Sequence, residues 1–139
     1  MEVLTGSRLF MNKNEIINKL DSLHLDKTQY WLVAGAAMVL YGIRDITCDI
    51  DIGCSKMLAD ELESSGYPTS AMPNGMRRIQ ISEDVEAFEN WYHDKVCIHN
   101  GFHIITLIGL LEMKRELGRE KDMDDIVLIE EYMGKNMLL

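Results

Sequence analysis

The sequence predicts one α+β (α/β) domain over residues 1–139, with helices packed mainly on one face of a mixed sheet of four to five strands. Residues 48–53 alternate between polar and apolar side chains, which is typical of a strand with one buried face. Residues 12–15 carry a helix-capping signal, and apolar residues at helical spacing follow it. Asn100-Gly101 separates two β-like runs and predicts a hairpin. A chain of this length can bury a hydrophobic core, so we expect a single domain.

The expected elements follow one another along the chain. The first is an amphipathic helix from about residue 13 to 23, which we interpret as structural. In order, the others are strand 30–33, a glycine turn and short helix at 35–40, strand 48–53, helix 57–64, a turn-rich segment at 67–75, strands 76–81 and 85–91, a hairpin of 95–99 and 102–105, helix 107–117 and helix 122–133. Thr106 and Gly118 are expected to bound the penultimate helix, and Gly134 to end the last one.

The composition is that of an ordinary globular protein, with 47% apolar and 27% charged residues. No apolar run approaches the roughly 18–20 residues needed to span a bilayer, and the first residues lack the features of a signal peptide. Three cysteines without a CxxC pair indicate neither a disulfide framework nor a zinc site. We therefore expect a cytoplasmic protein that does not contact a membrane.

The net charge of −9 argues against sequence-independent binding of nucleic acid by the whole surface. A local basic patch is compatible with the sequence, and it would consist of Arg77, Arg78, Lys114, Arg115, Arg119 and Lys121. His99 and His103 lie four residues apart, but the Asn-Gly turn between them removes them from one helical face. We therefore do not interpret them as a metal-binding pair.

Asp49-Ile50-Asp51 is the stretch around which the predicted site is organised. In a strand the two carboxylates point to one face and Ile50 to the other. Like charges so close repel one another unless a cation lies between them, and a hard divalent ion with oxygen ligands fits this requirement. Upstream, Gly35 precedes a short helix, whose N-terminus suits a bound phosphate.

Gly35, the run Tyr41-Gly42-Ile43-Arg44, Thr47 and Asp49-Ile50-Asp51 together resemble the nucleotidyltransferase superfamily with its polymerase-beta-like fold. The signature of that family is an apolar residue, two small residues led by glycine, a spacer and Asp-apolar-Asp. The similarity is greatest to the minimal nucleotidyltransferases and to those of abortive-infection toxin and toxin–antitoxin type. The chain departs from the signature at Ala34, which stands where the family has its first glycine. With the C-terminal motif, the resemblance covers residues 31–125.

The resemblance implies a third metal-binding carboxylate, and Glu86 in Val85-Glu86-Ala87 is the candidate. On a neighbouring strand it would face the two aspartates and complete a two-metal site. Alternatively, Glu86 is a solvent-facing strand residue. Glu89 competes with it, and Glu83 or Asp84 would serve if the strand register is shifted.

Lys114 and the run Arg119-Glu-Lys-Asp122 with Asp125 resemble the C-terminal helices of the same family. This resemblance implies that Lys114 contacts a phosphate and that Asp122 belongs to the site. The plain alternatives are a solvated helix face for Lys114 and a helix-start role for Asp122 and Asp125, since aspartate there stabilises a helix by about 1 kcal/mol.

The implied activity is transfer of a nucleoside monophosphate from a nucleoside triphosphate, such as ATP, to a hydroxyl acceptor, with release of pyrophosphate. Asp49, Asp51 and Glu86 would bind Mg²⁺ or Mn²⁺. Gly35 and Ala36 would cradle the phosphates, and Lys114 would offset the charge of the leaving pyrophosphate. Arg44 and Thr47 would fix the loop before the carboxylate strand, and Arg44 is also a candidate for contact with a phosphate.

The acceptor stays open among tRNA, a protein side chain and a small molecule, and the chain is compatible with a homodimer or a partner protein. The first alternative function is a non-catalytic module of the same fold that binds nucleotide or regulates another protein. Ala34 and the acidic surface favour that alternative. The retained carboxylates disfavour it, because clustered acids without a cation cost stability. An interaction protein of unrelated function is the second alternative.

Overall fold

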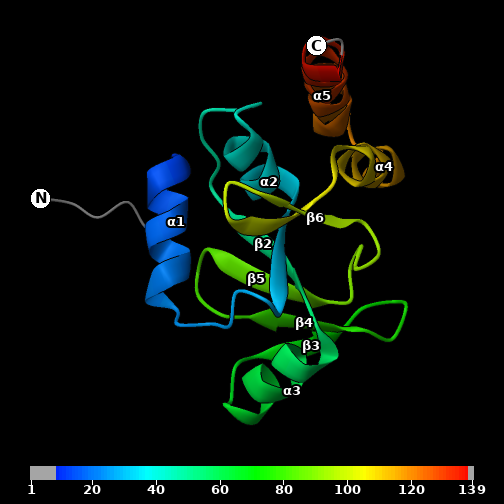
Figure 1. Cartoon of the computed structure of the whole chain (residues 1–139). Helices are drawn as coiled ribbons and strands as arrows, with labels where there is room; N and C mark the ends of the chain where they lie inside the picture. The colour runs from blue at the N-terminus through cyan, green and yellow to red at the C-terminus, as the bar shows by residue number, and fades with distance from the viewer. Residues whose placement is uncertain (1–8, 138–139) are drawn as a thin grey trace, which may run out of the picture.

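A computed structural model describes residues 9–137, which form a seven-stranded mixed sheet and five helices (Figure 1). The helices are α1 (Lys13–Ser22), α2 (Ala34–Tyr41), α3 (Lys56–Ser64), α4 (Leu107–Leu117) and α5 (Glu120–Met137). The strands are β1 (Tyr30–Val33), β2 (Ile50–Cys54), β3 (Thr69–Ala71), β4 (Arg77–Gln80), β5 (Val85–Glu89), β6 (Val96–His99) and β7 (Phe102–Ile105). No helix within the described residues is long and apolar enough to cross a membrane.

Strand β2 lies at the centre of the sheet, whose order is β3-β4-β5-β2-β1-β7-β6. It pairs antiparallel with β1 and parallel with β5. The strands alternate, and one face of the sheet carries side chains that are fully buried, among them Leu32, Ile50, Ile52, Ile79 and Ala87. Helix α2 contacts β1 and β2, and α3 contacts β4 and β5. The opposite face carries Asp51, because it lies between two inward-facing isoleucines.

Helix α1 begins at a capping box, as the sequence predicts. The Asn12 side chain accepts a hydrogen bond from the backbone of Glu15 at 3.0 Å, and Glu15 accepts one from the backbone of Asn12 at 3.1 Å. Ile16 and Leu20 on the inner side of the helix are buried. The cap and the apolar face together confirm both the position and the structural role of this helix.

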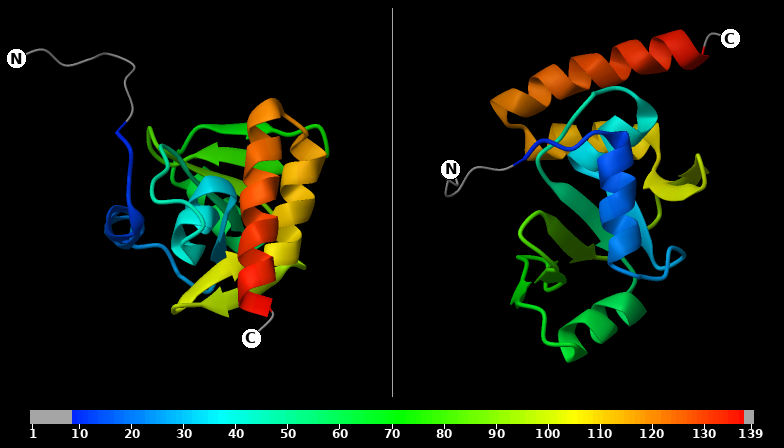
Figure 2. Two further views of the ribbon diagram at one scale, coloured as in Figure 1. Left: turned by 90° about the horizontal axis from the view of Figure 1, so that it is seen from above. Right: turned by 90° about the vertical axis from the view of Figure 1, so that its left-hand side faces the viewer.

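The last two helices form a hairpin in which α4 and α5 lie side by side (Figure 2). Thr106 caps α4, and Gly118 ends it in the left-handed conformation with φ 58°, as predicted. The prediction for the last helix was too short, since α5 begins at Glu120 and continues past Gly134. A glycine inside a helix costs only about 1 kcal/mol relative to alanine, so it does not have to end one.

The sheet has more strands than the four to five predicted, for two reasons. The hairpin of β6 and β7 joins the main sheet through pairing of β7 with β1. Strand β3 lies inside the segment predicted as turn-rich and pairs with β4 at the edge of the sheet. Three residues close to Pro68 and Pro73 are too short a run to show alternation, so the pattern does not predict this strand.

Ala34 adopts a φ of 52°, in the left-handed region that favours glycine. Ala34→Gly should therefore raise the free energy of unfolding by about 0.5–1 kcal/mol, because glycine adopts this conformation without the steric cost of a Cβ atom. Chemical denaturation measures the change. Gly35→Ala is the control with the opposite sign, since a Cβ atom there would lie 2.5 Å from the Thr47 hydroxyl oxygen. A destabilised Ala34→Gly protein would contradict this account of the turn.

Candidate active site

Asp51 and Glu86 are direct neighbours on parallel strands. The register of β2 and β5 pairs Asp51 with Glu86, and the antiparallel register with β1 pairs Asp51 with Val33. Asp49 immediately precedes β2. The sequence therefore correctly predicts that Glu86 lies on a neighbouring strand, across the ladder from the Asp-Ile-Asp stretch.

Two of the alternatives to Glu86 differ clearly from it in position. Glu89 lies three residues further along β5, on the opposite face, where it is buried and accepts hydrogen bonds from the backbone and side chain of Arg77, both at 3.0 Å. Asp84 lies before β5, and its carboxylate accepts a hydrogen bond from the Ser82 hydroxyl at 2.8 Å. Glu83 and Asp84 nevertheless line a hollow of about 230 Å³ that Asp49, Asp51 and Glu86 also line.

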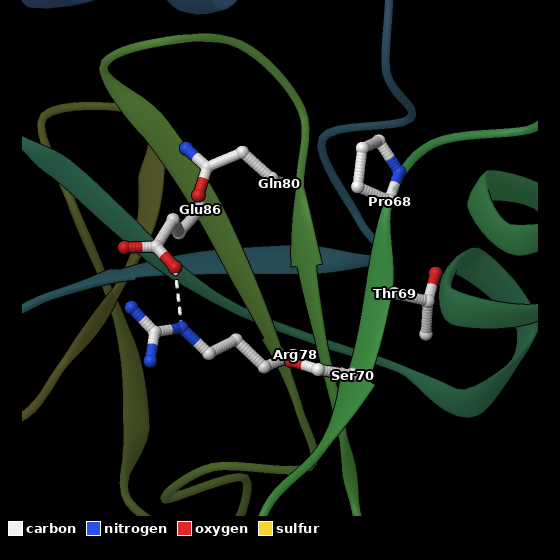
Figure 3. A pocket seen from close by; sticks show the side chains of 6 residues that line it. All are labelled: Pro68, Thr69, Ser70, Arg78, Gln80 and Glu86. Atoms are coloured by element: carbon white, nitrogen blue, oxygen red, sulfur yellow. Dashed lines mark hydrogen bonds and ion pairs between the residues drawn. The ribbon is translucent and has the colours of Figure 1, made fainter.

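Glu86 forms an ion pair with Arg78, its neighbour from β4 (Figure 3). The two side chains point toward one another from adjacent strands, and a hollow of about 370 Å³ opens beside them toward Pro68 and Thr69 at the edge strand. Because the Arg78 guanidinium already neutralises much of the Glu86 charge, a cation that binds Glu86 must compete with this arginine.

Burial, and after it the nearby negative charge of Glu86, raise the pKa of Asp51 from 3.8 to about 6. The positive charges of Arg78, Lys114 and Lys121 act against this rise without cancelling it. Asp51 is therefore a carboxylate whose charged form lacks sufficient positive partners within the protein. A bound divalent cation would supply the missing positive charge.

Gly35 forms a tight turn against Thr47. A Cβ atom at Gly35 would lie 2.5 Å from the Thr47 hydroxyl oxygen, so only glycine fits here. Thr47 is buried and exchanges two backbone hydrogen bonds with Met11, at 2.7 and 3.0 Å. These contacts hold the loop that leads into β2, which agrees with the positioning role expected for Thr47.

Lys114 is buried. The alternative interpretation, in which Lys114 lies on a solvated helix face, is therefore wrong. The Nζ atom of Lys114 lies 2.9 Å from Asp125 Oδ2 and 3.5 Å from Asp122 Oδ1. Arg44 approaches the same Asp125 at 3.8 Å. The amphipathic pattern does not reveal this burial, because both partners of Lys114 come from another helix, α5.

Asp122 combines a structural role with its place in this network. It is fully buried, and Arg119 donates to it from its backbone at 3.0 Å and from its guanidinium at 2.7 and 3.1 Å. These bonds, led by the Arg119 side chain, lower the pKa of Asp122 to about 2. Asp122 occupies the third position of α5, which begins two residues earlier than expected, so the helix-start role is correct for Asp122. It is wrong for Asp125, which lies beyond the first turn.

A cavity of about 850 Å³ brings most of the predicted site residues together. Its lining includes the predicted residues Gly35, Arg44, Thr47, Asp49, Asp51, Glu86 and Lys114. Ala36 and Asp122 are fully buried, and Asp122 lies 3.5 Å from the Nζ atom of Lys114. A volume of this size is typical of a small-molecule site.

The predicted basic patch is divided. Arg78, Lys114, Arg119 and Lys121 line the cavity. Arg77 instead binds Asp60, Glu63 and Glu89, and Arg115 pairs with Glu130 at 3.2 Å. The cavity therefore combines carboxylates with four of the six predicted cations, a mixture that suits an anionic ligand accompanied by a metal ion.

The cavity also has an aromatic wall that the motif analysis did not include. Phe88 and Trp91 line it, and their ring centroids lie 4.8 Å apart. Phe88 follows Glu86 by two residues and therefore shares its face of β5. The alternation of side chains along β5 could therefore have predicted that Phe88 shares the face of Glu86. Trp91 lies in the turn after β5, where no periodicity predicts the direction of its side chain.

The donor set fits a divalent cation in its chemistry, because it offers carboxylate oxygens and an undercompensated negative charge at Asp51. Within residues 9–137, however, no group of three or more His, Cys, Asp or Glu side chains is gathered so that it could hold a metal ion alone. Mg²⁺ is often bound by one or two carboxylates plus the phosphates of a substrate. The arrangement therefore fits a cation that arrives with a phosphate ligand.

Comparison of the chain with protein-family models, with curated proteins and with solved structures finds no match.

The raised pKa of Asp51 predicts a pH-dependent stability. Because the folded state holds the proton more tightly than the unfolded state, the contribution of Asp51 to stability should fall as the pH rises from about 4 to about 6. Asp51→Asn removes this effect, so in chelator-treated protein the variant should gain stability over the parent across this window, by up to about 3 kcal/mol at neutral pH. Denaturant titrations at several pH values measure the difference.

Asp60→Asn is the matched control for that experiment. Hydrogen bonds from Arg77 lower the pKa of Asp60, so its charged form stabilises the fold and the same substitution should lose stability above pH 4. A pH-independent difference between the parent and Asp51→Asn would show that Asp51 is better compensated than this geometry implies.

Removal of the Lys114 side chain should be strongly destabilising. Lys114→Ala leaves the buried carboxylates of Asp122 and Asp125 without their lysine, and breaking a buried pair typically costs about 3–5 kcal/mol. Lys121→Ala, at the exposed rim of the same cavity, should change the free energy of unfolding by less than about 0.5 kcal/mol. Thermal and chemical denaturation measure the losses. Equal and small losses of stability in the two variants would show that Asp122 and Asp125 do not depend on the charge of Lys114.

Proposed function

We propose that the protein is a metal-dependent nucleotidyltransferase, which moves a nucleoside monophosphate from a nucleoside triphosphate to a hydroxyl acceptor and releases pyrophosphate. The observation that carries this proposal is the in-register pair of Asp51 and Glu86 on parallel strands, in the wall of a cavity that also contains cationic side chains. The motif order along the sequence supports the same family and its polymerase-beta-like fold.

The proposed roles follow from position and charge. Asp49, Asp51 and Glu86 would bind Mg²⁺ or Mn²⁺, which would supply Lewis-acid chemistry at the phosphates when bound. Burial and the negative charge of Glu86 raise the pKa of Asp51, and a cation bound at the acidic pair would offset both effects, so the pair favours such a cation.

The β- and γ-phosphates would lie at the Gly35 turn, which directly follows Val33, the neighbour of Asp51 on β1. Gly35 is the second residue of α2, at the N-terminal end, where backbone N–H groups favour an anion. Lys114 lines the same cavity, but its charge is shared with Asp122 and Asp125. We therefore propose that Lys114 acts electrostatically, and that Arg44 is the more available cation for direct phosphate contact, since its distance to Asp125 is 3.8 Å.

The second candidate function is a non-catalytic nucleotide-binding module of the same fold. Two observations favour it, namely the ion pair that occupies Glu86 and the strained backbone at Ala34. In such a module the cavity would still bind nucleotide, but the acidic pair would not promote transfer.

The test is incubation of the protein with an α-labelled nucleoside triphosphate and Mg²⁺, in separate reactions with tRNA, protein and hydroxylated small molecules as acceptors. The expected result is pyrophosphate release and label on one acceptor class. Asp51→Asn and Glu86→Gln should each slow transfer by roughly a hundredfold or more, the scale for losing one preorganised electrostatic group.

Glu83→Gln is the matched control, because Glu83 is exposed and lies before β5 rather than in register with Asp51. It should retain most of the activity. Nucleotide binding without transfer to any acceptor class would favour the second candidate, and absence of both would contradict the two nucleotide functions together.

A further inference from the structure

The face of the sheet that carries Asp51 has two adjacent cross-strand rows of residues. The first row runs across β1, β2, β5 and β4 and consists of Val33, Asp51, Glu86 and Gln80. The second row lies two residues away along the strands and consists of Trp31, Gly53, Phe88 and Arg78. An acidic row is thus followed by an aromatic row, at a spacing of about 6.6 Å along the strand direction.

Gly53 allows the aromatic row to pack closely. A Cβ atom at Gly53 would overlap the Trp31 indole, so the indole lies directly over this glycine. The indole nitrogen of Trp31 donates a hydrogen bond of 2.8 Å to the backbone oxygen of Trp91. Trp31 is itself buried, and it therefore serves to position Trp91 rather than to contact a ligand.

Phe88, Trp91 and Arg78 form a platform that faces the cavity. All three line the cavity that contains Asp51, and the rings of Phe88 and Trp91 lie 4.8 Å apart with an interplanar angle of 48°. The Arg78 guanidinium carbon lies 5.7 Å from the Phe88 ring centroid. Phe88 and Trp91 are only partly buried, so the ring surfaces are accessible from the cavity.

The backbone on either side of Trp91 is also unusual. Asn90 and Tyr92 both have a φ of 56°, and a positive φ is rare for a bulky residue such as tyrosine. The turn therefore holds Trp91 in one direction at a conformational cost, which the hydrogen bond from Trp31 helps to offset.

We propose that the Phe88–Trp91–Arg78 platform binds the nucleobase of the nucleotide whose phosphate lies at the acidic row. This inference rests on the proposed function, and it adds the site that holds the base. A planar aromatic ring is the ligand that stacks on aromatic side chains and on a guanidinium, and such stacking tolerates every base. The offset between the rows corresponds to the ribose that separates a base from its phosphate. The exposed surface of purines is larger, so purine nucleotides should bind more tightly than pyrimidine nucleotides.

The experiment compares two probes in the presence of Mg²⁺, a non-hydrolysable α,β-methylene analogue of ATP and inorganic tripolyphosphate, which lacks a base. Isothermal titration gives the affinities, and quenching of tryptophan fluorescence reports stacking near Trp91. The parent should bind the ATP analogue more tightly, and only the analogue should quench fluorescence. Phe88→Leu should weaken binding of the analogue about tenfold and leave tripolyphosphate unchanged.

Phe102→Leu is the matched control, because Phe102 lies in β7 outside the cavity, with Lys27 over its ring at 5.1 Å. It should leave both affinities unchanged. Equal affinities of the parent for the two probes, equal weakening of both by Phe88→Leu, or no binding of either would overturn the inference. Base-dependent binding without nucleotide transfer would support the platform and refute the proposed function alone.

Discussion

The register between β2 and β5 is the constraint on which the candidate site depends. It places Asp51 beside Glu86 on parallel strands, and it places Ile50 and Ile52 on the buried face. A shift by one residue would exchange the two faces, expose the isoleucines and bury the carboxylates. The hydrophobic core therefore determines the position of the acidic pair, since any other register would lose the burial of several apolar side chains.

The same register creates an unfavourable electrostatic situation that the rest of the fold only partly relieves. Burial and Glu86 raise the pKa of Asp51. The nearest cations have other partners, because Arg78 pairs with Glu86 and Lys114 pairs with Asp122 and Asp125. A carboxylate that stays undercompensated among several cations is more typical of a functional site than of a structural ion-pair network.

The helical hairpin contributes to the site through buried charge. Lys114 on α4 and Asp122 on α5 are both buried, although charged residues are rarely so. The contact of Lys114 with Asp125, and of Asp125 with Arg44, connects α4 and α5 to the loop before β2. The hairpin therefore forms one wall of the cavity, and its stability and the geometry of the site should change together.

Local signals in the sequence were sufficient to predict much of this architecture. Asn12, Thr106 and Gly118 mark helix ends by hydrogen bonds within a few residues, so their roles are visible in the sequence. The face shared by Asp51 and Glu86 follows from strand parity. The features that were missed depend on distant contacts, as in the burial of Lys114, or on runs too short to show a period, as in β3.

The most direct test is a measurement of Mn²⁺ uptake. Mn²⁺ is titrated into protein that carries nucleotide, and electron paramagnetic resonance monitors uptake as a loss of the free-ion signal. The parent should take up Mn²⁺ beyond the amount that the nucleotide alone binds, because the Asp51 carboxylate lacks a sufficient positive partner. Asp51→Asn should remove this additional uptake. Equal uptake by the parent and by Asp51→Asn would contradict the assignment of this carboxylate pair as the metal site.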